Sequence, residues 1–349
     1  MCNSCYEFLY ENAAPIIKYE AAPHSGTQNL KLHDELLKDD TIRYWIACSK
    51  EFAVNPRVHD SFDTRLENWG HKLISFGITE EDDKHIEALN KYVLRYIKEN
   101  EGNEKFFDSI SNVIAASYLS QMGCEDKIVL DIIKGRVDAL YPFAKQGGFD
   151  IYADKNDFPR IPEARARYPL VKPELYEGNV WRLPTVHDIF AFSKLPQSMA
   201  SDGALKSKIK VIIEYIMTPE YQKLPWGYGL MLVPPRTYYS MGWSVKLSRF
   251  FTQEAPNGID PILWETELMS HFDAARDSKW FELRMDYLEH FKRGSFYEFP
   301  KSFLTEAKNK YYVGGGHMGL GENRRARNWE AVESTAWMMR ILRNTGISE

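Results

Sequence analysis

The sequence predicts an all-α protein whose helices form an α/α toroid, a ring of inner and outer helices. Apolar residues recur at helical spacing through most of the 349 residues, and the alternation typical of strands is almost absent. About ten to twelve helices are expected, and a more apolar helix is often followed by a more amphipathic one. No repeat of about 34 or 40 residues is present, so we expect a ring rather than a regular solenoid. Residues 1–349 are expected to form a single domain.

The first part of the chain predicts short helices. Residues 8–10 and 15–19 are amphipathic and are separated at Pro15, and residues 30–37 and 41–48 continue the same pattern.

A longer helix is predicted over residues 64–76, where apolar side chains recur every three or four positions. Asp60 or Ser61 is expected to cap its free amides. Gly77 is expected to end it in the left-handed conformation.

Three longer helices follow. Acidic residues at 80–83 precede an apolar pattern over 86–97, and an acidic first turn suits the positive end of the helix dipole. This helix start explains the acids without a metal ion. Residues 106–119 are nearly all apolar or small, which predicts a buried helix, and residues 126–141 predict its amphipathic partner.

Three segments predict long ordered loops at the rim of the ring, at residues 146–184, 224–243 and 311–328. The first carries Gly147 and Gly148, several prolines and many aromatic residues, a composition too aromatic for a linker. We expect it to form a lid. The second segment is expected to form a hairpin.

The remaining helices are predicted over 189–195, 206–217, 261–275, 278–291, 300–307 and 329–343. Thr185 is the expected cap of the first of these, with two polar residues in its first turn.

Composition excludes several classes of protein. The net charge is −5 and the pI is about 6.0, so no nucleic-acid partner is expected, although the basic run at 324–327 can meet one anionic group. No apolar run approaches the roughly 20 residues of a membrane span, and the N-terminus does not resemble a signal peptide. We therefore expect a cytoplasmic protein without a membrane span; its oligomeric state stays open.

The four cysteines, Cys2, Cys5, Cys48 and Cys124, are too few and too scattered for a disulfide scaffold. Cys2 and Cys5 have the Cys-x-x-Cys spacing of some metal sites, but no second pair accompanies them. No metal site is predicted.

The first candidate site is the glycine segment, which holds five glycines within residues 314–321. Glycine lets the backbone approach a ligand closely, and the next helix adds a partial positive charge. His317 and Glu322 are candidate catalytic residues. Two interpretations stay open: arginines that grip an anionic group, and arginines that pair with a glutamate to lock the turn. The candidate binding residues here are Arg324, Arg325, Trp329 and Glu333.

The second candidate site is His187 with Asp188, just after Arg182, a candidate binding residue. A histidine titrates near neutrality, so this pair is a candidate for proton transfer. Adjacent helical residues point about 100° apart, however, and an acid in a first turn is also typical of a simple dipole partner.

The third candidate site is aromatic, because such rings stabilise cations and stack on flat or sugar ligands. Tyr239 is the candidate proton donor. Ordinary core packing is the alternative. The candidate binding residues are Tyr152, Trp181, Trp226, Tyr228, Arg236, Tyr238 and Trp243.

The run Glu-Ser-Thr-Ala-Trp-Met-Met-Arg-Ile-Leu at 333–342, after a Gly-Gly segment, resembles the repeat of the squalene cyclase and protein prenyltransferase superfamily. Residues 60–76 and 184–195 resemble weaker copies. The resemblance implies an α/α toroid with a pocket at one end of the ring. The Asp-x-Asp-Asp acid motif of the cyclases is absent, and so is the zinc-ligand set of the prenyltransferases.

The expected function is a terpenoid cyclase-like or prenyltransferase-like enzyme that acts on an apolar or polycyclic small molecule in an aromatic-lined cavity. No cofactor is expected, apart from Mg²⁺ if the substrate is a diphosphate. A carbohydrate-active lyase or hydrolase on a similar ring is the alternative, with an open aromatic cleft. A non-catalytic binding protein is the third possibility.

Overall fold

The computed structural model describes residues 3–22, 27–102, 106–252, 254, 259–308 and 311–346. With 58% helix and 5% strand, it confirms the all-α prediction. The α-helices of the described residues are α1 (Asn3–Asn12), α2 (Pro15–Ala21), α3 (Thr27–Leu36), α4 (Asp40–Ser49), α5 (Leu66–Ser75), α6 (Lys84–Glu99), α7 (Phe106–Gln121), α8 (Lys127–Gln146), α9 (Val186–Ser193), α10 (Gln197–Ala200), α11 (Gly203–Ile216), α12 (Pro219–Lys223), α13 (Ile262–Ser270), α14 (Asp273–Arg276), α15 (Lys279–Glu289), α16 (Lys301–Leu304) and α17 (Trp329–Thr345).

Two small hairpins and several 3-10 turns complete the described elements. Strands β1 (Leu230–Val233) and β2 (Thr237–Ser240) pair antiparallel with Met231 opposite Tyr239, which confirms the hairpin predicted in the second rim loop. Strands β3 (Lys292–Arg293) and β4 (Phe296–Tyr297) form the other. The 3-10 turns are η1 (Lys50–Ala53), η2 (Lys155–Asp157), η3 (Glu163–Arg165), η4 (Pro173–Leu175), η5 (Glu177–Asn179) and η6 (Tyr312–Gly314).

The predicted cap at Asp60 or Ser61 is wrong. Helix α5 begins later, after Arg65, which makes no side-chain cap bond. Instead, Asp60 accepts a hydrogen bond from the amide of Ser61, and Asn68 donates to the carbonyl of Asp60 at 3.0 Å. The loop that carries Asp60 is therefore bound by a side chain of α5, and it does not cap the helix. Gly77 does follow the helix with a φ of 72°, as predicted.

Other helix boundaries also differ from the sequence pattern: the helix predicted over 300–307 ends at Leu304, and the one predicted over 126–141 continues to Gln146. The acids at 80–83 lie before α6 rather than inside its first turn, and Asp83 caps the helix by accepting from the amide of His85 at 2.6 Å. The single helix predicted over 261–275 is two helices, α13 and α14, because Phe272 between them is extended. Thr185, in contrast, caps α9 as predicted, within a full capping box.

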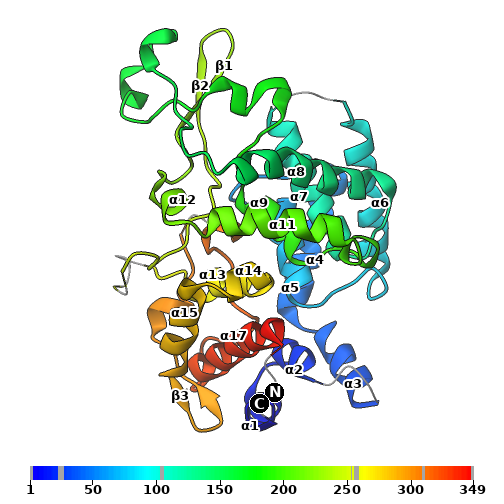
Figure 1. Ribbon diagram of the computed structural model, residues 1–349. Helices are drawn as coiled ribbons and strands as arrows, with labels where there is room; N and C mark the ends of the chain where they lie inside the picture. The colour runs from blue at the N-terminus through cyan, green and yellow to red at the C-terminus, as the bar shows by residue number, and fades with distance from the viewer. Residues whose placement is uncertain are drawn as a thin grey trace.

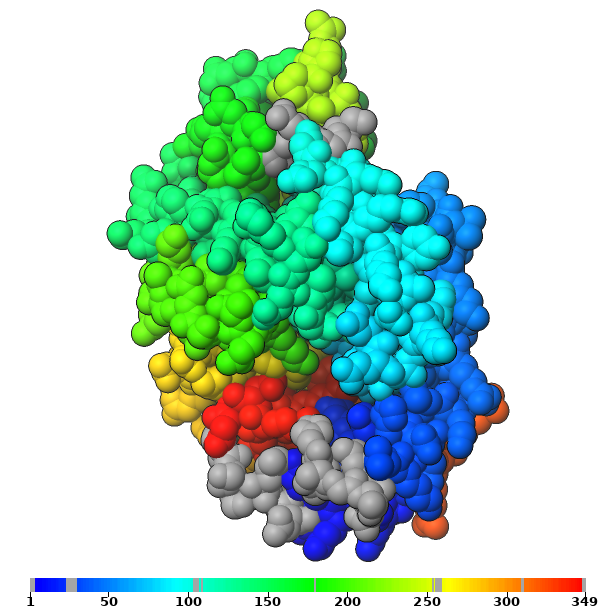
Figure 2. Space-filling model, turned by 90° about the vertical axis from the view of Figure 1, so that its right-hand side faces the viewer, coloured from blue at the N-terminus to red at the C-terminus, as the bar shows by residue number. Residues whose placement is uncertain are grey.

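The helices pack as one continuous body (Figure 1). In its upper part α7 contacts α5, α6, α8 and α9, and α11 lies on α8. In its lower part α17 contacts α13, α1 and α2, and α13 also contacts α9 and so joins the two parts. Figure 2 shows α17 (red) directly beside the N-terminal helices (dark blue). The guanidinium of Arg340 binds the carboxylate of Glu20 at 2.7 and 2.6 Å there.

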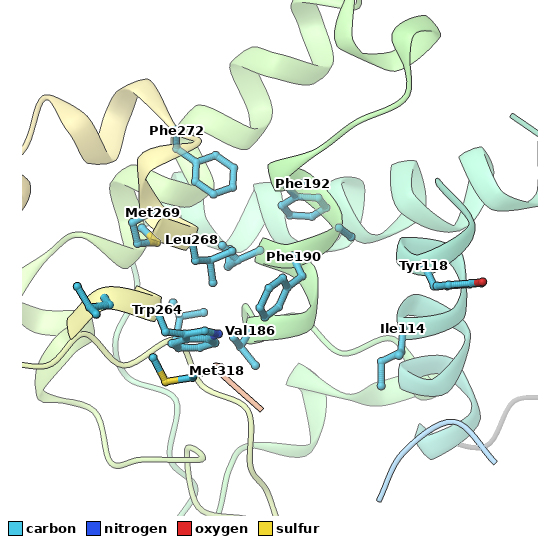
Figure 3. Packing of buried hydrophobic residues seen from close by; sticks show 14 of the residues in the cluster. Ile114, Tyr118, Val186, Phe190, Phe192, Trp264, Leu268, Met269, Phe272 and Met318 are labelled. Carbon is cyan, nitrogen blue, oxygen red and sulfur yellow. The ribbon is translucent and has the colours of Figure 1, made fainter. Parts of the chain in front are cut away.

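The core runs along α9 and α13 at the centre of this body. Phe190 of α9 faces Trp264 of α13, with 5.9 Å between ring centroids, and Leu268 and Val186 lie beside them (Figure 3). All four side chains are buried. Across the described residues, no helix combines the length and the apolar character that a bilayer crossing requires.

The first rim loop packs on the hairpin. Tyr152 bridges Val171 within it, and Leu170 bridges Leu230 at the start of β1. Leu170, Leu230 and Tyr238 form a small apolar cluster between the loop and the hairpin. The predicted lid is thus an ordered layer over the β1–β2 hairpin.

Candidate functional site

A cavity of about 540 Å³ lies between α9, α13, the segment after β2 and η6. Its wall is mostly apolar and carries three indole rings, those of Trp226, Trp243 and Trp264, together with Leu268 and Met269. Two of the three tryptophans, Trp226 and Trp243, were predicted as binding residues. We call this space the tryptophan cavity.

The segment after β2 is fixed where it forms the cavity wall. Trp243 has a φ of 70°, a conformation that side chains rarely adopt, and its carbonyl accepts a hydrogen bond from the amide of Val186 at 2.7 Å. The neighbouring Ser244 accepts from the amide of Gly227 at 2.8 Å. These bonds hold Trp226 at the rim of the cavity, where it is 72% exposed.

A buried acid, Glu265 of α13, also lines the cavity. One carboxylate oxygen accepts from the amide of Ser248 at 2.7 Å and from its hydroxyl at 2.6 Å. Burial raises the pKa of Glu265 to about 7, and the bonds from Ser248 oppose this rise only in part. Both protonation states are therefore accessible near neutral pH, which suits an acid or base.

The half-buried Lys246 lines the same cavity. Its ammonium donates to the carbonyl of Gln222. Burial lowers the pKa of Lys246 to about 8, so a part of the population is neutral under physiological conditions. The sequence analysis singled out neither this residue nor Glu265.

The cavity ends at a cluster formed by His59, Glu67 and His187. His59 lines the cavity, and its Nδ1 forms a close hydrogen bond with the carboxylate of Glu67. His187 is 1% exposed, and among the described residues neither ring nitrogen has a hydrogen-bond partner. One nitrogen or carboxylate oxygen of each residue lies within 4.8 Å of the others.

Burial controls the charge of this cluster. It lowers the pKa of His187 well below the ordinary value, with help from the neighbouring His59 and His71, so His187 is neutral. It raises the pKa of Glu67, against the hydrogen bond from His59. Imidazole and carboxylate are both ligand types for divalent metal ions.

The sequence predicted His187 but missed His59 and Glu67. His59 lies in a loop and Glu67 in the first turn of α5, and their spacing matches no short metal or catalytic motif. The sequence does contain a feature that indicates Glu265. It is an acid close to Leu263, Trp264 and Leu268 in a strongly apolar helix, where a charged residue is unusual.

Asp188 lies away from the cluster, as adjacent helical residues do. Its carboxylate accepts from the guanidinium of Arg136 at 2.8 and 3.0 Å and from the amide of Thr185 at 2.8 Å. It is fully buried. These contacts favour a structural role, in which Asp188 fixes the start of α9 and hence the position of His187.

The glycine segment borders the cavity only at Tyr311, Val313 and Gly314. His317 Nε2 lies 3.3 Å from a carboxylate oxygen of Asp63, and His317 does not line the cavity. Glu322 accepts from the amide of Ala14 at 2.7 Å. The two predicted catalytic residues of this segment therefore contact other parts of the protein.

The arginines of this segment divide between two environments. Arg324 pairs with the buried Glu333 at 2.9 Å and lies over the ring of Trp329, 5.1 Å from its centroid. Glu333 also accepts from the amide of Leu320 at 3.1 Å. These contacts match the interpretation in which an arginine locks the turn. Arg325 is exposed.

Four other predicted aromatic residues, Tyr152, Trp181, Tyr228 and Tyr238, do not line the cavity. Tyr152 donates to the carbonyl of Tyr228 at 2.8 Å, and Tyr238 donates to the carbonyl of Pro159. Trp181 and Tyr228 are fully buried with their rings 5.8 Å apart. They form a packed wall.

Three more predicted residues are near the surface. Tyr239 is 39% exposed beside Phe107, with 5.2 Å between rings. Arg236 is exposed at the tip of the hairpin, and Arg182 donates to the carbonyl of Glu174 at 2.8 Å. None of the three lines the tryptophan cavity.

Of the two cysteines with Cys-x-x-Cys spacing, Cys2 lies outside the described residues and Cys5 is fully buried in the core. Cys48 is also buried.

Comparisons with protein-family models, with curated proteins and with solved structures give no match to this chain. The tryptophan cavity and the groups on its wall are therefore the basis for a functional assignment.

Proposed function

We propose that this protein is an enzyme that binds an apolar small molecule in the tryptophan cavity and changes it by proton transfer. A single observation carries the proposal: a mostly apolar cavity of about 540 Å³ has on its wall a buried carboxyl, Glu265, with a pKa of about 7. A strongly shifted pKa in a pocket is a common mark of a catalytic acid or base.

The size and the lining of the cavity support an apolar substrate. Pockets of roughly 300–1,000 Å³ hold small-molecule ligands, and indole and aliphatic walls favour apolar ones. The indole faces also stabilise positive charge, by about 0.5–2 kcal/mol each. A cyclase-like or prenyltransferase-like reaction, in which a carbocation forms beside aromatic rings, is the specific reaction class that we propose.

Two groups on the wall have suitable protonation states. Glu265, when protonated, donates a proton to a double bond or an oxygen of the substrate. Lys246, when neutral, accepts one. The surrounding apolar side chains exclude water from these transfers.

The proposed ring arrangement of the helices agrees with this role. The contacts of α17 with α1 and α2 bring the last helix back to the first ones, as closure of a ring requires. The cavity lies beside α9 and α13, and these two helices lie near the middle of the ribbon in Figure 1.

The test combines binding and turnover. Native mass spectrometry and tryptophan fluorescence are measured with apolar ligands, including squalene-like polyenes and prenyl diphosphates with and without Mg²⁺, and products are analysed by mass spectrometry. We expect binding and conversion of at least one of them. Glu265→Gln is expected to keep binding and lose conversion, and the control Glu289→Gln, on α15 and outside the cavity lining, to keep both. If the whole panel neither bound nor reacted, the proposal would be rejected.

A carbohydrate-active enzyme is the second candidate, and the exposed Trp226 at the rim favours it. An exposed indole beside a cavity is a stacking surface for a sugar ring. Oligosaccharides are therefore included in the same panel. Binding that Trp226→Ala abolishes, with cleavage of the sugar, would select this candidate, and binding without any conversion would select a non-catalytic binding protein.

A further inference from the structure

We propose that His59, Glu67 and His187 bind one divalent transition-metal ion of the zinc or iron(II) class at the wall of the tryptophan cavity. This site goes beyond the proposed function, because its occupancy does not depend on which substrate the cavity accepts. It supplies a centre that can polarise an oxygen of a bound molecule.

The spacing of the three side chains suits a metal ion. One ligand atom from each lies within 4.8 Å of the others. Bonds from zinc to nitrogen or oxygen are about 2.0–2.2 Å long, so ligand atoms around one ion are about 3–4 Å apart. The ligand atoms of this cluster are therefore already near the separation that one shared ion requires.

Unsatisfied polar atoms point to a missing partner. His187 is 1% exposed, and neither of its ring nitrogens has a hydrogen-bond partner among the described residues. Glu67 is fully buried, and its Oε1 also lacks one. Burying such a group without a partner costs about 1–3 kcal/mol. A shared metal ion satisfies both residues at once.

The three residues are held by rigid parts of the fold. The amide of Glu67 donates to the carbonyl of Val58 at 3.0 Å, which fixes the loop that carries His59 next to the start of α5. His187 lies in the first turn of α9, where the ion pair of Arg136 with Asp188 fixes the helix start. Arg136 and Asp188 thus act as positioning residues for His187.

The kind of metal follows from the ligands. Two imidazoles and one carboxylate suit zinc, iron(II), cobalt(II) or nickel(II), whereas magnesium and calcium prefer oxygen ligands alone. Three protein ligands also leave at least one coordination position open. His59 is the residue of the cluster that lines the cavity, with 27% of its side chain exposed, so the cavity is the route by which a molecule reaches an ion held there.

The experiment measures the metal itself. Protein treated with a chelator is titrated with Zn²⁺ by calorimetry and with Co²⁺ by absorption spectroscopy, and bound metal is counted by mass spectrometry after dialysis. We expect one ion per chain, Co²⁺ bands of a nitrogen and oxygen site, and a rise in melting temperature with Zn²⁺.

Matched variants connect the ion to these residues. His59→Ala and Glu67→Gln are expected to weaken Zn²⁺ binding at least tenfold. One control is expected to bind as the unchanged protein does: His33→Ala, another partly exposed histidine paired with an acid, Asp82. Changes to the fully buried His187 risk misfolding, so His59→Ala, checked by circular dichroism, carries the test.

Two results would overturn the site. One is a folded protein that retains far less than one ion per chain at micromolar free metal, as expected if a buried water joins His187 to Glu67. The other is equal affinity in His59→Ala and the unchanged protein. No substrate is used, so a failure of the metal site and a failure of the proposed function are separate results.

Discussion

The ammonium group of Lys72 donates a hydrogen bond of 2.9 Å to the carbonyl oxygen of His317. It also donates to the carbonyl of Gly319, so a side chain of α5 binds two carbonyl groups of the glycine segment. Lys72 is buried, and burial lowers its pKa to about 7. The segment that suggested a ligand loop thus has its carbonyl groups directed toward a buried lysine.

Lys72→Met is expected to lower the free energy of unfolding by about 1–3 kcal/mol, because two carbonyl groups lose their donor. Urea denaturation at neutral pH measures the change. Lys91→Met, which removes an exposed ammonium from α6, is the control and is expected to unfold as the unchanged protein does. Equal midpoints for the two variants would contradict a bracing role for Lys72.

Arg136→Met is expected to destabilise the protein by about 3–5 kcal/mol, because it leaves the carboxylate of Asp188 buried without its ion-pair partner. Thermal and urea unfolding measure the loss. Lys208→Met, which breaks the exposed pair with Asp138, is the control and is expected to change little. A stable Arg136→Met protein that lost only activity would instead favour a catalytic role for Asp188.

The pH dependence of stability is expected to contain a contribution from Glu265. Its folded pKa, about 7, is above the ordinary 4.5, so between these values the folded state binds more protons than the unfolded state. The contribution of Glu265 to the free energy of unfolding is complete below about pH 4.5. It is lost as the pH rises to about 7, and the total loss is about 3 kcal/mol. Glu265→Gln is expected to remove this fall, as seen in urea midpoints from pH 4.5 to 8. Parallel curves for the two proteins would show that the pKa is not raised.

Gly227→Ala is expected to disrupt the cavity rim. Gly227 has a φ of 71°, and an added Cβ would overlap the carbonyl oxygen of Met241. Gly178, with a φ of 64° and no atom within 4 Å of the added Cβ, is the matched control. Gly178→Ala is expected to cost only the roughly 1–2 kcal/mol of the left-handed conformation, and Gly227→Ala clearly more. Calorimetry measures the loss of unfolding free energy in each variant. Equal losses would mean that the backbone near Met241 moves to accommodate the added Cβ at Gly227.

Glu322→Ala is expected to lower the melting temperature by a few degrees, because the amide of Ala14 loses its acceptor. Arg325→Ala is expected to leave it unchanged, since this side chain is exposed. Neither is expected to change binding in the tryptophan cavity. Loss of ligand binding in either variant, with an unchanged melting temperature, would restore the glycine segment as a ligand site.

Local patterns predicted the local structure well. The apolar spacing in α5 and α17, the cap at Thr185 and the hairpin after Trp226 depend on neighbours in the sequence, and the structure has them where the sequence indicates. Trp226 and Trp243, predicted as binding residues because aromatic rings stabilise cations and stack on flat ligands, line the tryptophan cavity.

Contacts between distant segments were not predictable in this way. His59 and His187 are 128 positions apart, and the packing of α5, α7 and α9 brings the loop of His59 next to the first turn of α9. Lys72 gave no signal either, because its two carbonyl partners are backbone groups far along the chain. Burial of a charged side chain is a tertiary property, and a helical pattern shows only which face is apolar.

The pairing of Glu20 with Arg340 has a consequence for the order of folding. The two residues are 320 positions apart, and α17, which carries Arg340, is buried along most of its length between α13 and the N-terminal helices. During synthesis, the faces of α1 and α2 that pack on α17 therefore stay uncovered until α17 itself has been made. Such a contact across the full sequence slows folding, and a nascent chain that lacks α17 is expected to depend on chaperones.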